Sequence, residues 1–221
     1  MYFYDQDKKI VKIPITKKIS HRFNTHYIYK TVNGKCLKRF RVVKEPDLQT
    51  ERKIQSLQLD NIYRIDQYLF NATGDFRGII MPYYDVSSED ILLKPSDYLA
   101  DNFSTIFSSF KRLSDEGIIA ADANLENTIF TNDEIIIIDT ERYYEDKTQS
   151  IEDIKQNNYA SASWILYFSL IKAAKKHQQL QDIPFYEWFY STRPDGITLC
   201  RELTHYQYPI EYLQKVKKKV K

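Results

Sequence analysis

Residues 120–141 read AADANLENTIFTNDEIIIIDTE, and this stretch decides how the rest of the chain is interpreted. Asp122 and Asn127 stand five positions apart, and a run of four isoleucines leads directly into Asp139. A carboxylate placed after a buried strand costs free energy unless it is paired, hydrogen-bonded or bound to a cation. An amide oxygen and a carboxylate at adjacent strand ends suit Mg²⁺, which prefers hard oxygen ligands and retains waters. The stretch therefore predicts a metal–nucleotide site.

Asp122 fits a second chemical role at the same place. A carboxylate that precedes the Asn by this fixed interval can accept a proton from an attacking hydroxyl. A simpler interpretation stays open, in which Asp122 caps a turn and Asp139 ends a strand. For any one residue alone the simpler interpretation is preferred, whereas the order of the three together favours a site.

Composition and charge limit the class of protein. The chain has 221 residues, of which 43% are hydrophobic and 28% charged, as in soluble globular proteins. This length suffices for one substantial domain or for two small lobes that share a cleft. The net charge of +2 is too balanced to imply nucleic acid by itself. Five lysines in residues 211–221 favour a solvated helix end over an RNA-binding or other anion-binding tail.

Cysteine content and hydrophobic runs indicate a cellular compartment. Cys36 and Cys200 form no disulfide framework and no metal-ligand spacing, which is typical of a reducing compartment. Residues 1–10 lack the apolar core of a signal peptide, and no apolar run approaches the roughly 20 residues of a membrane span. We expect a cytoplasmic protein without a membrane span.

The first part of the chain reads as a small sheet that carries one helix. β-Branched and aromatic runs predict five strands, and the turn residues Asn33 and Gly34 separate the second strand from the third. A helical pattern lies between the third strand and the fourth. The predicted strands are residues 12–19, 26–32, 35–43, 62–70 and 76–84, and the predicted helix is residues 45–59.

After Tyr84 the pattern becomes mainly helical. A short helix within residues 87–99 is predicted to stop at Pro95, and apolar residues at helical spacing then predict an amphipathic helix that stops at Gly117. A hairpin follows around residues 131–133. The remaining predicted helices are residues 154–175, which are apolar almost all round, and the aromatic-rich segments 183–190 and 209–216.

The pattern Asp-x-x-x-x-Asn, short hairpin, then apolar strand ending in Asp resembles the catalytic loop and metal-binding strand of the protein-kinase-like superfamily. This superfamily includes eukaryotic-type protein kinases and the related aminoglycoside and choline kinases. The resemblance implies an α+β, two-lobed fold, with a β-rich N-lobe at residues 1–84 and a helical C-lobe at residues 85–221. It also implies that Asp122 is the catalytic base, and that Asn127 and Asp139 are the metal ligands.

The resemblance extends into the N-terminal part and spans roughly residues 12–172. Lys38 in KCLKRF is similar to the lysine of the family's V-A-I-K stretch, and Glu51 stands on the following helix, where the family holds that lysine against the nucleotide phosphates. Strand alternation places Lys38 on one face with Cys36 and Phe40. A surface lysine and a solvated glutamate are the alternative for these two residues.

The segment GIIMPYY resembles the family's connection between the lobes, which meets adenine through its backbone. By this resemblance Met81 and Tyr83 belong to the nucleotide site, with Met81 lining its entrance.

The sequence departs from the family pattern in three places. Residues 20–27 contain no glycine, so the side chains of Ser20, Asn24 and Thr25 would have to contact the phosphates. Ala120-Ala121 replaces His-Arg, and we therefore expect no switch by a phosphorylated loop. The tripeptide that begins at Asp139 continues with Thr140 and Glu141; Glu141 is either a further metal ligand or a solvated loop residue.

The segment after Asp139 is short and contains no Ala-Pro-Glu, so the peptide-docking platform of a protein kinase is reduced or missing. The acceptor is therefore open between a protein Ser/Thr and a small hydroxyl compound. We expect a phosphotransferase that uses ATP and Mg²⁺. The alternative is a catalytically inactive kinase-like module that binds a partner.

Overall fold

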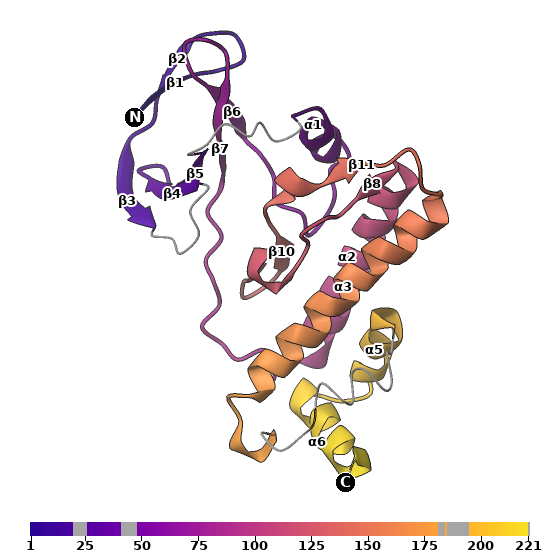
Figure 1. The fold of residues 1–221 in the computed structure, drawn as a ribbon. Helices are drawn as coiled ribbons and strands as arrows, with labels where there is room; N and C mark the ends of the chain where they lie inside the picture. Colours follow the sequence, from indigo (N-terminus) through magenta and orange to yellow (C-terminus); the bar gives the residue numbers. More distant parts are fainter. Residues whose placement is uncertain (20–25, 41–47, 181–183, 185–194, 221) are drawn as a thin grey trace. The chain divides into compact units, whose positions relative to one another are not determined.

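A computed structural model of the chain describes residues 1–19, 26–40, 48–180, 184 and 195–220 (Figure 1). Backbone contacts divide the chain into two compact units. The first unit consists of Met1–Gln58 and Tyr63–Asp85, and the second consists of Leu59–Ile62 and Val86–Lys221. The chain combines an antiparallel sheet in the first unit with helices in the second, so it is a mixed α and β protein.

The first unit is built on a seven-stranded sheet in the order β2-β1-β6-β7-β5-β4-β3. All its strand pairs are antiparallel. Its strands are β1 (Tyr2–Tyr4), β2 (Ile10–Lys12), β3 (Ile15–Ile19), β4 (His26–Thr31), β5 (Lys35–Phe40), β6 (Gln67–Phe70) and β7 (Phe76–Pro82). The turn between β4 and β5 forms at Gly34 as predicted, where φ is +70° and the N–H of Gly34 donates to the carbonyl of Thr31.

The sheet has two strands more than the five predicted. The additional strands β1 and β2 pair with each other, and β1 extends the sheet through Tyr4 opposite Phe70. Each additional strand has only three residues, which is shorter than the runs from which a strand can be recognised in sequence. Tertiary packing holds them, because Phe3 is 6% exposed within a core cluster.

The two faces of the sheet carry different side chains. One face carries that core cluster, which includes Leu37, Leu69 and Ile80. The opposite face carries Lys38 of β5, which stands across from Ile79 of β7, and Ile79 in turn stands across from Tyr68 of β6. The helix α1 (Leu48–Ser56) buries three of its residues, Thr50, Glu51 and Ile54.

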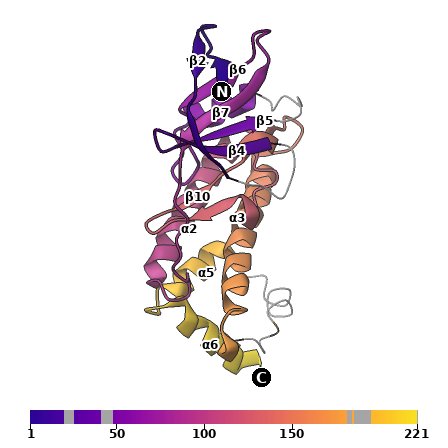
Figure 2. The same ribbon diagram turned by 90° about the vertical axis from the view of Figure 1, so that its left-hand side faces the viewer.

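The second unit is built around α2 (Ser96–Asp115) and α3 (Ile151–Ala174), which pack side by side (Figures 1 and 2). The helix α5 (Gly196–Leu203) packs against both, and α6 (Pro209–Val220) follows it, which confirms the helix predicted near the C-terminus. The 3-10 turn η3 (Gln178–Leu180) lies between α3 and α5 along the chain. The helix predicted at residues 183–190 lies outside the described residues.

The start of α2 corrects one prediction. Pro95 does not stop a helix within residues 87–99; it stands immediately before α2, with φ −52° and ψ 140°. Proline is tolerated at a helix start because the missing N–H would be unsatisfied there in any case. At its other end α2 is followed by Gly117, whose φ of +72° agrees with the predicted stop.

Two short antiparallel ladders complete the second unit. The predicted hairpin is confirmed as β9 (Thr128–Phe130) with β10 (Ile135–Ile137). A second ladder joins β8 (Ile118–Ile119) to β11 (Tyr144–Glu145). The 3-10 turns η1 (Leu125–Asn127) and η2 (Thr140–Arg142) lie directly before β9 and shortly after β10.

Across the described parts of the chain, every helix is too short or too polar to cross a membrane.

Candidate functional site

A compact turn holds the loop that begins at Asp122. The side chain of Asn124 accepts the backbone N–H groups of Glu126 and Asn127 at 2.8 and 3.1 Å. Its Nδ2 donates to the carbonyl and to the Oδ1 of Asp122 at 2.9 and 3.0 Å. Asn124 therefore organises the backbone of the loop and also contacts the carboxylate that the sequence analysis proposes as a base.

The structure brings Asn127 and the end of the isoleucine run together. The Nδ2 of Asn127 donates to the carbonyl of Asp122 at 2.9 Å, and this orientation turns the Oδ1 of Asn127 away from that carbonyl. The backbone N–H of Ile138 donates to the carbonyl of Asn127 at 2.8 Å. Because Asp139 directly follows Ile138, all three predicted loop residues belong to one hydrogen-bonded region of the second unit.

Two of these three residues have left-handed backbone conformations. The φ of Asp122 is +63° and that of Asp139 is +64°. Asp and Asn tolerate this region better than other side chains except glycine, but the conformation still costs about 1 kcal/mol or more at each position. Such strain persists only where the surroundings impose it, and it concentrates at functional sites.

A buried amide fixes the chain just before the loop. Asn158 of α3 is 0% exposed and accepts the N–H of Ala120 at 2.7 Å. Its Nδ2 donates to the carbonyl of Ile118 and to the hydroxyl of Ser114, each at 2.9 Å. This residue was not singled out from the sequence, where Asn157 and Asn158 stand side by side in a helix otherwise predicted to be apolar almost all round.

An ion pair joins the loop to the turn after Asp139. Arg142 of η2 lies 3.4 Å from the Oδ2 of Asp122, and the two side chains are 71% and 38% exposed. A pair this exposed contributes little to folding, about 0–1 kcal/mol. The sequence analysis did not single out Arg142. Glu141, its neighbour, is half-buried, and its role as a metal ligand or a loop residue stays open.

The loop offers ligand atoms of the type that Mg²⁺ prefers. Asn127 offers an amide oxygen and Asp139 a carboxylate, both hard ligands that leave positions for waters or phosphates. Within the described residues there is no group of three or more His, Cys, Asp and Glu side chains that could hold a metal ion.

The first unit buries the two charged residues that the sequence analysis assigned to the nucleotide phosphates. Lys38 is 1% exposed and Glu51 is 2% exposed. This burial excludes the alternative of a surface lysine and a solvated glutamate. The Nζ of Lys38 lies 5.6 Å from the centre of the Phe40 ring, in agreement with the predicted shared face.

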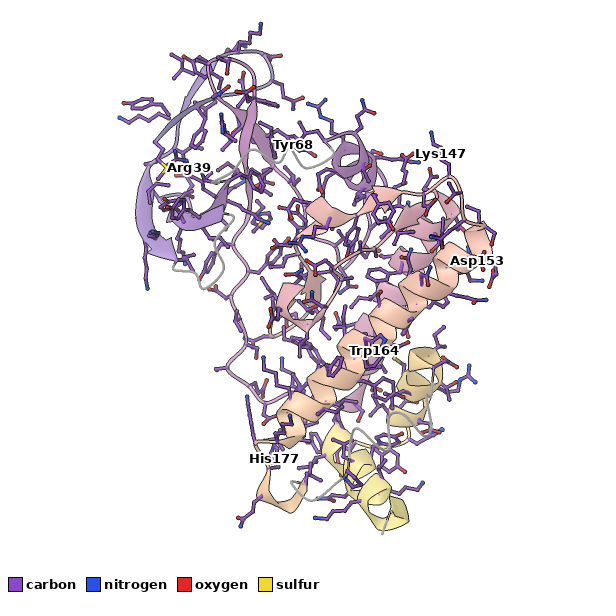
Figure 3. All side chains as sticks on the ribbon, viewed as in Figure 1. Arg39, Tyr68, Lys147, Asp153, Trp164 and His177 are labelled. Atoms are coloured by element: carbon purple, nitrogen blue, oxygen red, sulfur yellow. The ribbon has the colours of Figure 1, made fainter. Side chains whose placement is uncertain are left out.

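Tyr68 shows that Lys38 and Glu51 lie on the same side of the sheet. Tyr68 projects from β6 (Figure 3), in the cross-strand row that contains Lys38. Burial and the nearby carboxylate of Glu51 together raise the pKa of Tyr68 to about 12, while Arg52 opposes the shift. The Cζ of Arg52, next to Glu51 in α1, lies 5.5 Å from the centre of the Tyr68 ring, so α1 lies on the side of the sheet from which Lys38 projects.

Two neutral side chains hold Glu51 in place. Its Oε1 accepts the hydroxyl of Tyr63 at 3.3 Å and the Nε2 of Gln55 at 3.2 Å. Gln55 also donates to the carbonyl of Tyr63 and accepts the N–H of Ile65. The carboxylate is thus fixed by α1 itself and by the segment that leads into β6.

The residues predicted to meet adenine lie at the end of β7. Met81 is 5% exposed and stands across from Cys36, and Tyr83, half-buried, follows the strand. The Nζ of Lys30 lies 3.9 Å from the centre of the Tyr83 ring. Their contact with adenine stays a prediction. Ser20, Asn24 and Thr25, predicted to contact phosphate, lie outside the described residues.

Comparison with known proteins identifies the fold. No protein-family model matches the chain, and no curated protein matches it in sequence. Among solved structures, the kinase PK-1 of the Cydia pomonella granulovirus matches with a TM-score of 0.54 and 17% sequence identity, over 74% of this chain and 70% of the viral one. At this identity the match shows the fold alone. The chain has a kinase-like fold.

Proposed function

We propose that the chain is a divergent, two-lobed kinase-like phosphotransferase that transfers the γ-phosphate of ATP to a hydroxyl group and depends on Mg²⁺. One observation carries this proposal: on a kinase-like fold, the residues that the family's catalytic loop would require form one hydrogen-bonded, strained loop. Burial of Lys38 and Glu51 on one side of the sheet supports it further. A scaffold would not need a charged pair in that position, because buried charges are costly.

Each residue then has a role that its local geometry suits. Lys38 orients the nucleotide phosphates, and Glu51, fixed by Tyr63 and Gln55, keeps the lysine in place. Asn127 and Asp139 hold Mg²⁺, which neutralises charge on the phosphates when bound. Catalysis of this kind is mainly positioning and charge stabilisation, so the strained and hydrogen-bonded backbone of the loop contributes directly.

Asp122 accepts the proton of the acceptor hydroxyl. Its carboxylate is 38% exposed, so an acceptor can reach it, and Asn124 orients it by a hydrogen bond to its Oδ1. A general base must lie within hydrogen-bonding distance of the hydroxyl that it activates. Arg142 contacts the other carboxylate oxygen and has to share it with the acceptor.

A second candidate function is binding without phosphoryl transfer. The ion pair between Arg142 and Asp122 favours it, because it occupies the group proposed as the base. Ala120-Ala121, in place of the family's His-Arg, favours it as well. In this case the same fold would present a nucleotide or a partner surface but transfer no phosphate.

Incubation with γ-labelled ATP tests the first function against the second. The protein is incubated alone and with a cell extract, which is then separated into protein and metabolite fractions. We expect label in one fraction, which also identifies the acceptor class. The variant Asp139→Asn should reduce transfer by about a hundredfold or more, because it removes a charge that stabilises the transition state.

The matched control is Asp133→Asn, which alters an exposed Asp at the tip of the same hairpin. The control should retain full transfer. Equal transfer by wild type and Asp139→Asn would contradict the site. Absence of transfer together with stabilisation of the fold by ATP would leave the binding module as the function.

A further inference from the structure

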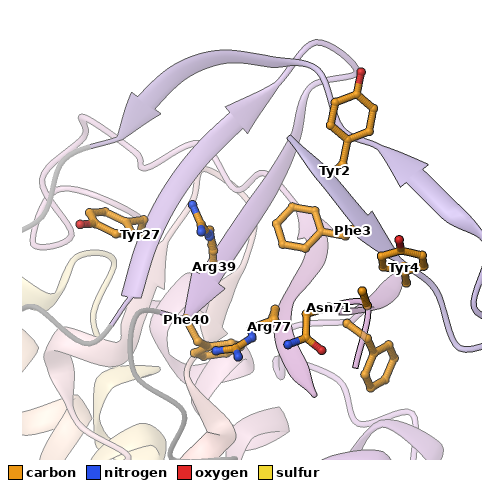
Figure 4. Close-up of a pocket in the computed structure, with 10 residues that line it drawn as sticks. Tyr2, Phe3, Tyr4, Tyr27, Arg39, Phe40, Asn71 and Arg77 are labelled. Carbon is orange, nitrogen blue, oxygen red and sulfur yellow. The ribbon is translucent and has the colours of Figure 1, made fainter. Parts of the chain in front are cut away.

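A cavity of about 480 Å³ opens in the first unit, and the described residues that line it all belong to that unit (Figure 4). They comprise six aromatic side chains, two arginines, Asn71 and Ala72; none of these ten is acidic. Small-molecule sites commonly have volumes of about 300–1,000 Å³ and a few polar groups within an apolar lining. The cavity has the volume of a ligand site, and its exposed lining is more polar than apolar.

A β-bulge brings the second arginine to this cavity. Leu69 pairs with Gly78 and Phe70 pairs with Phe76, so Arg77 is the additional residue of β7 at the register shift. A bulge redirects the side chains next to it and is often found beside functional sites. Arg77 thereby lines the same cavity as Arg39, which stands across from Gly78 on β5.

Gly78 fixes the pairing of the strands that carry the two arginines. It stands across from Arg39 on one side and from Leu69 on the other. A Cβ atom at this position would lie 2.5 Å from the carbonyl oxygen of Lys38, so the close approach of β5 and β7 requires glycine.

The two arginines give the cavity a positive charge. Arg39 is exposed, and Arg77 lies 3.5 Å from Asp75, longer than a good charge-assisted hydrogen bond of about 2.7–2.9 Å. Asp75 is already engaged by Asn71 and Thr73 at 2.7 and 2.8 Å, and these hydrogen bonds lower its pKa. Both guanidinium groups thus retain donors for an anion, and arginine recognises phosphate by paired donors.

The aromatic residues provide surfaces for a flat ring. Phe3, 6% exposed, belongs to the core cluster, whereas Tyr2 is 70% exposed and Tyr27 and Phe40 are half-buried. Stacking of a base on an aromatic side chain is worth about 1–3 kcal/mol and tolerates different bases. Figure 4 shows Arg39 between Tyr27 and Phe3, and Arg77 beside Asn71.

We propose that this cavity binds a phosphorylated ring compound of the size of a nucleoside monophosphate, with the phosphate on Arg39 and Arg77 and the ring on the aromatic side chains. The proposed phosphate contact at Arg39 differs from that at Lys38, because Arg39 follows Lys38 in β5 and the two side chains project from opposite faces of the sheet. Phe40, which also lines the cavity, shares the face of Lys38, and its ring centre lies 5.6 Å from the Lys38 Nζ. The proposal does not depend on phosphotransferase activity.

Calorimetric titration of the full chain with three probes tests this site. The probes are AMP, adenosine, which lacks the phosphate, and ribose 5-phosphate, which lacks the base. We expect AMP to bind more tightly than either fragment. The double variant Arg39→Ala/Arg77→Ala should weaken AMP and ribose 5-phosphate about tenfold or more and leave adenosine unchanged, because charged hydrogen bonds are lost.

Two further variants make the result specific. Arg64→Ala, which removes an exposed arginine of the same unit, should bind AMP as the wild type does. Arg39→Lys/Arg77→Lys, which keeps both charges, should restore part of the affinity and shows that the alanine variant is not merely misfolded.

Three results would overturn the proposal. The first is no detectable binding of AMP by the wild type. The second is unchanged AMP affinity in Arg39→Ala/Arg77→Ala, which would place the binding outside this cavity. The third is equal affinity for AMP and ribose 5-phosphate, which would remove the role of the aromatic side chains.

Discussion

The Lys38 side of the sheet and the loop from Asp122 to Arg142 hold their charged groups in opposite ways. In the first unit, Lys38 and Glu51 are almost fully buried, and strand register and packing fix them. In the loop, Asp122 is 38% exposed, and short hydrogen bonds and strained backbone fix it. A substitution at the buried face is therefore expected to lower the free energy of unfolding together with function. A substitution in the loop is expected to alter the proposed phosphoryl transfer with little effect on folding.

The largest effect on stability is expected at Asn158, where the buried support of the loop can be removed. Asn158→Ala leaves the N–H of Ala120, the carbonyl of Ile118 and the hydroxyl of Ser114 without this partner. At about 1–3 kcal/mol for each buried unsatisfied group, we expect a loss of about 4 kcal/mol in the free energy of unfolding. Urea denaturation measures it.

Asn157→Ala is the control for this variant, because Asn157 is exposed and adjacent on the same helix. It should change the free energy of unfolding by about 0.5 kcal/mol at most. Similar losses for the two variants would show that Asn158 does not support the loop from within the core.

The next largest effect is expected at Glu51 on the buried face. Glu51→Ala removes the acceptor of the Tyr63 hydroxyl and of Gln55 and leaves a buried lysine on the same side of the sheet. We expect a loss of about 3 kcal/mol in the free energy of unfolding. Gln49→Ala, an exposed change in the same helix, should be close to neutral. A neutral Glu51→Ala would mean that the carboxylate is solvated.

A smaller effect is expected at Asp139 in the loop. Asn tolerates the left-handed conformation about as well as Asp, so Asp139→Asn should change the free energy of unfolding by about 1 kcal/mol or less. The proposed metal binding should nevertheless be lost. Thermal unfolding with and without Mg²⁺·ATP separates the two effects. A loss of stability as large as that of Glu51→Ala would remove the contrast between the regions.

The smallest effect is expected at Arg142. Arg142→Ala removes an exposed ion pair with Asp122, which is worth about 0–1 kcal/mol. If the pair competes with the acceptor for Asp122, the variant should transfer phosphate at least as fast as the wild type. A rate measurement with γ-labelled ATP shows it. A fall in the rate would assign Arg142 a positioning role instead.

Local patterns predicted those parts of the fold that local physics decides. Gly34 marks a tight turn, Gly117 ends a helix and the isoleucine run forms the second strand of a hairpin, and each of these is confirmed. Pro95 was misinterpreted because the same residue is suited to the position after one helix and to the start of the next. The strands β1 and β2 were missed because their stability comes from residues distant in sequence.

In the candidate site, too, local sequence patterns predicted some features and missed those that depend on residues distant in sequence. The hydrogen-bonded region from Asp122 to Asp139 could be anticipated because its residues lie within one short segment, and their catalytic roles stay predictions. Asn158 was missed because its partner Ala120 is 38 residues away, and no local pattern links an Asn in a helix to that N–H. The position of Arg77 depends on a register shift between two strands, which only the paired sheet reveals.

Binding of Mg²⁺·ATP tests the central claim most directly, because the proposal assigns the nucleotide phosphates to Lys38 and the metal ion to Asp139. Calorimetry would compare the wild type with Lys38→Met of the first unit and Asp139→Asn of the second, beside the exposed controls Lys17→Met and Asp133→Asn. The account predicts that both controls bind as the wild type does and that each site variant weakens binding about tenfold or more. Undiminished binding by either site variant, or no binding by the wild type, would contradict it.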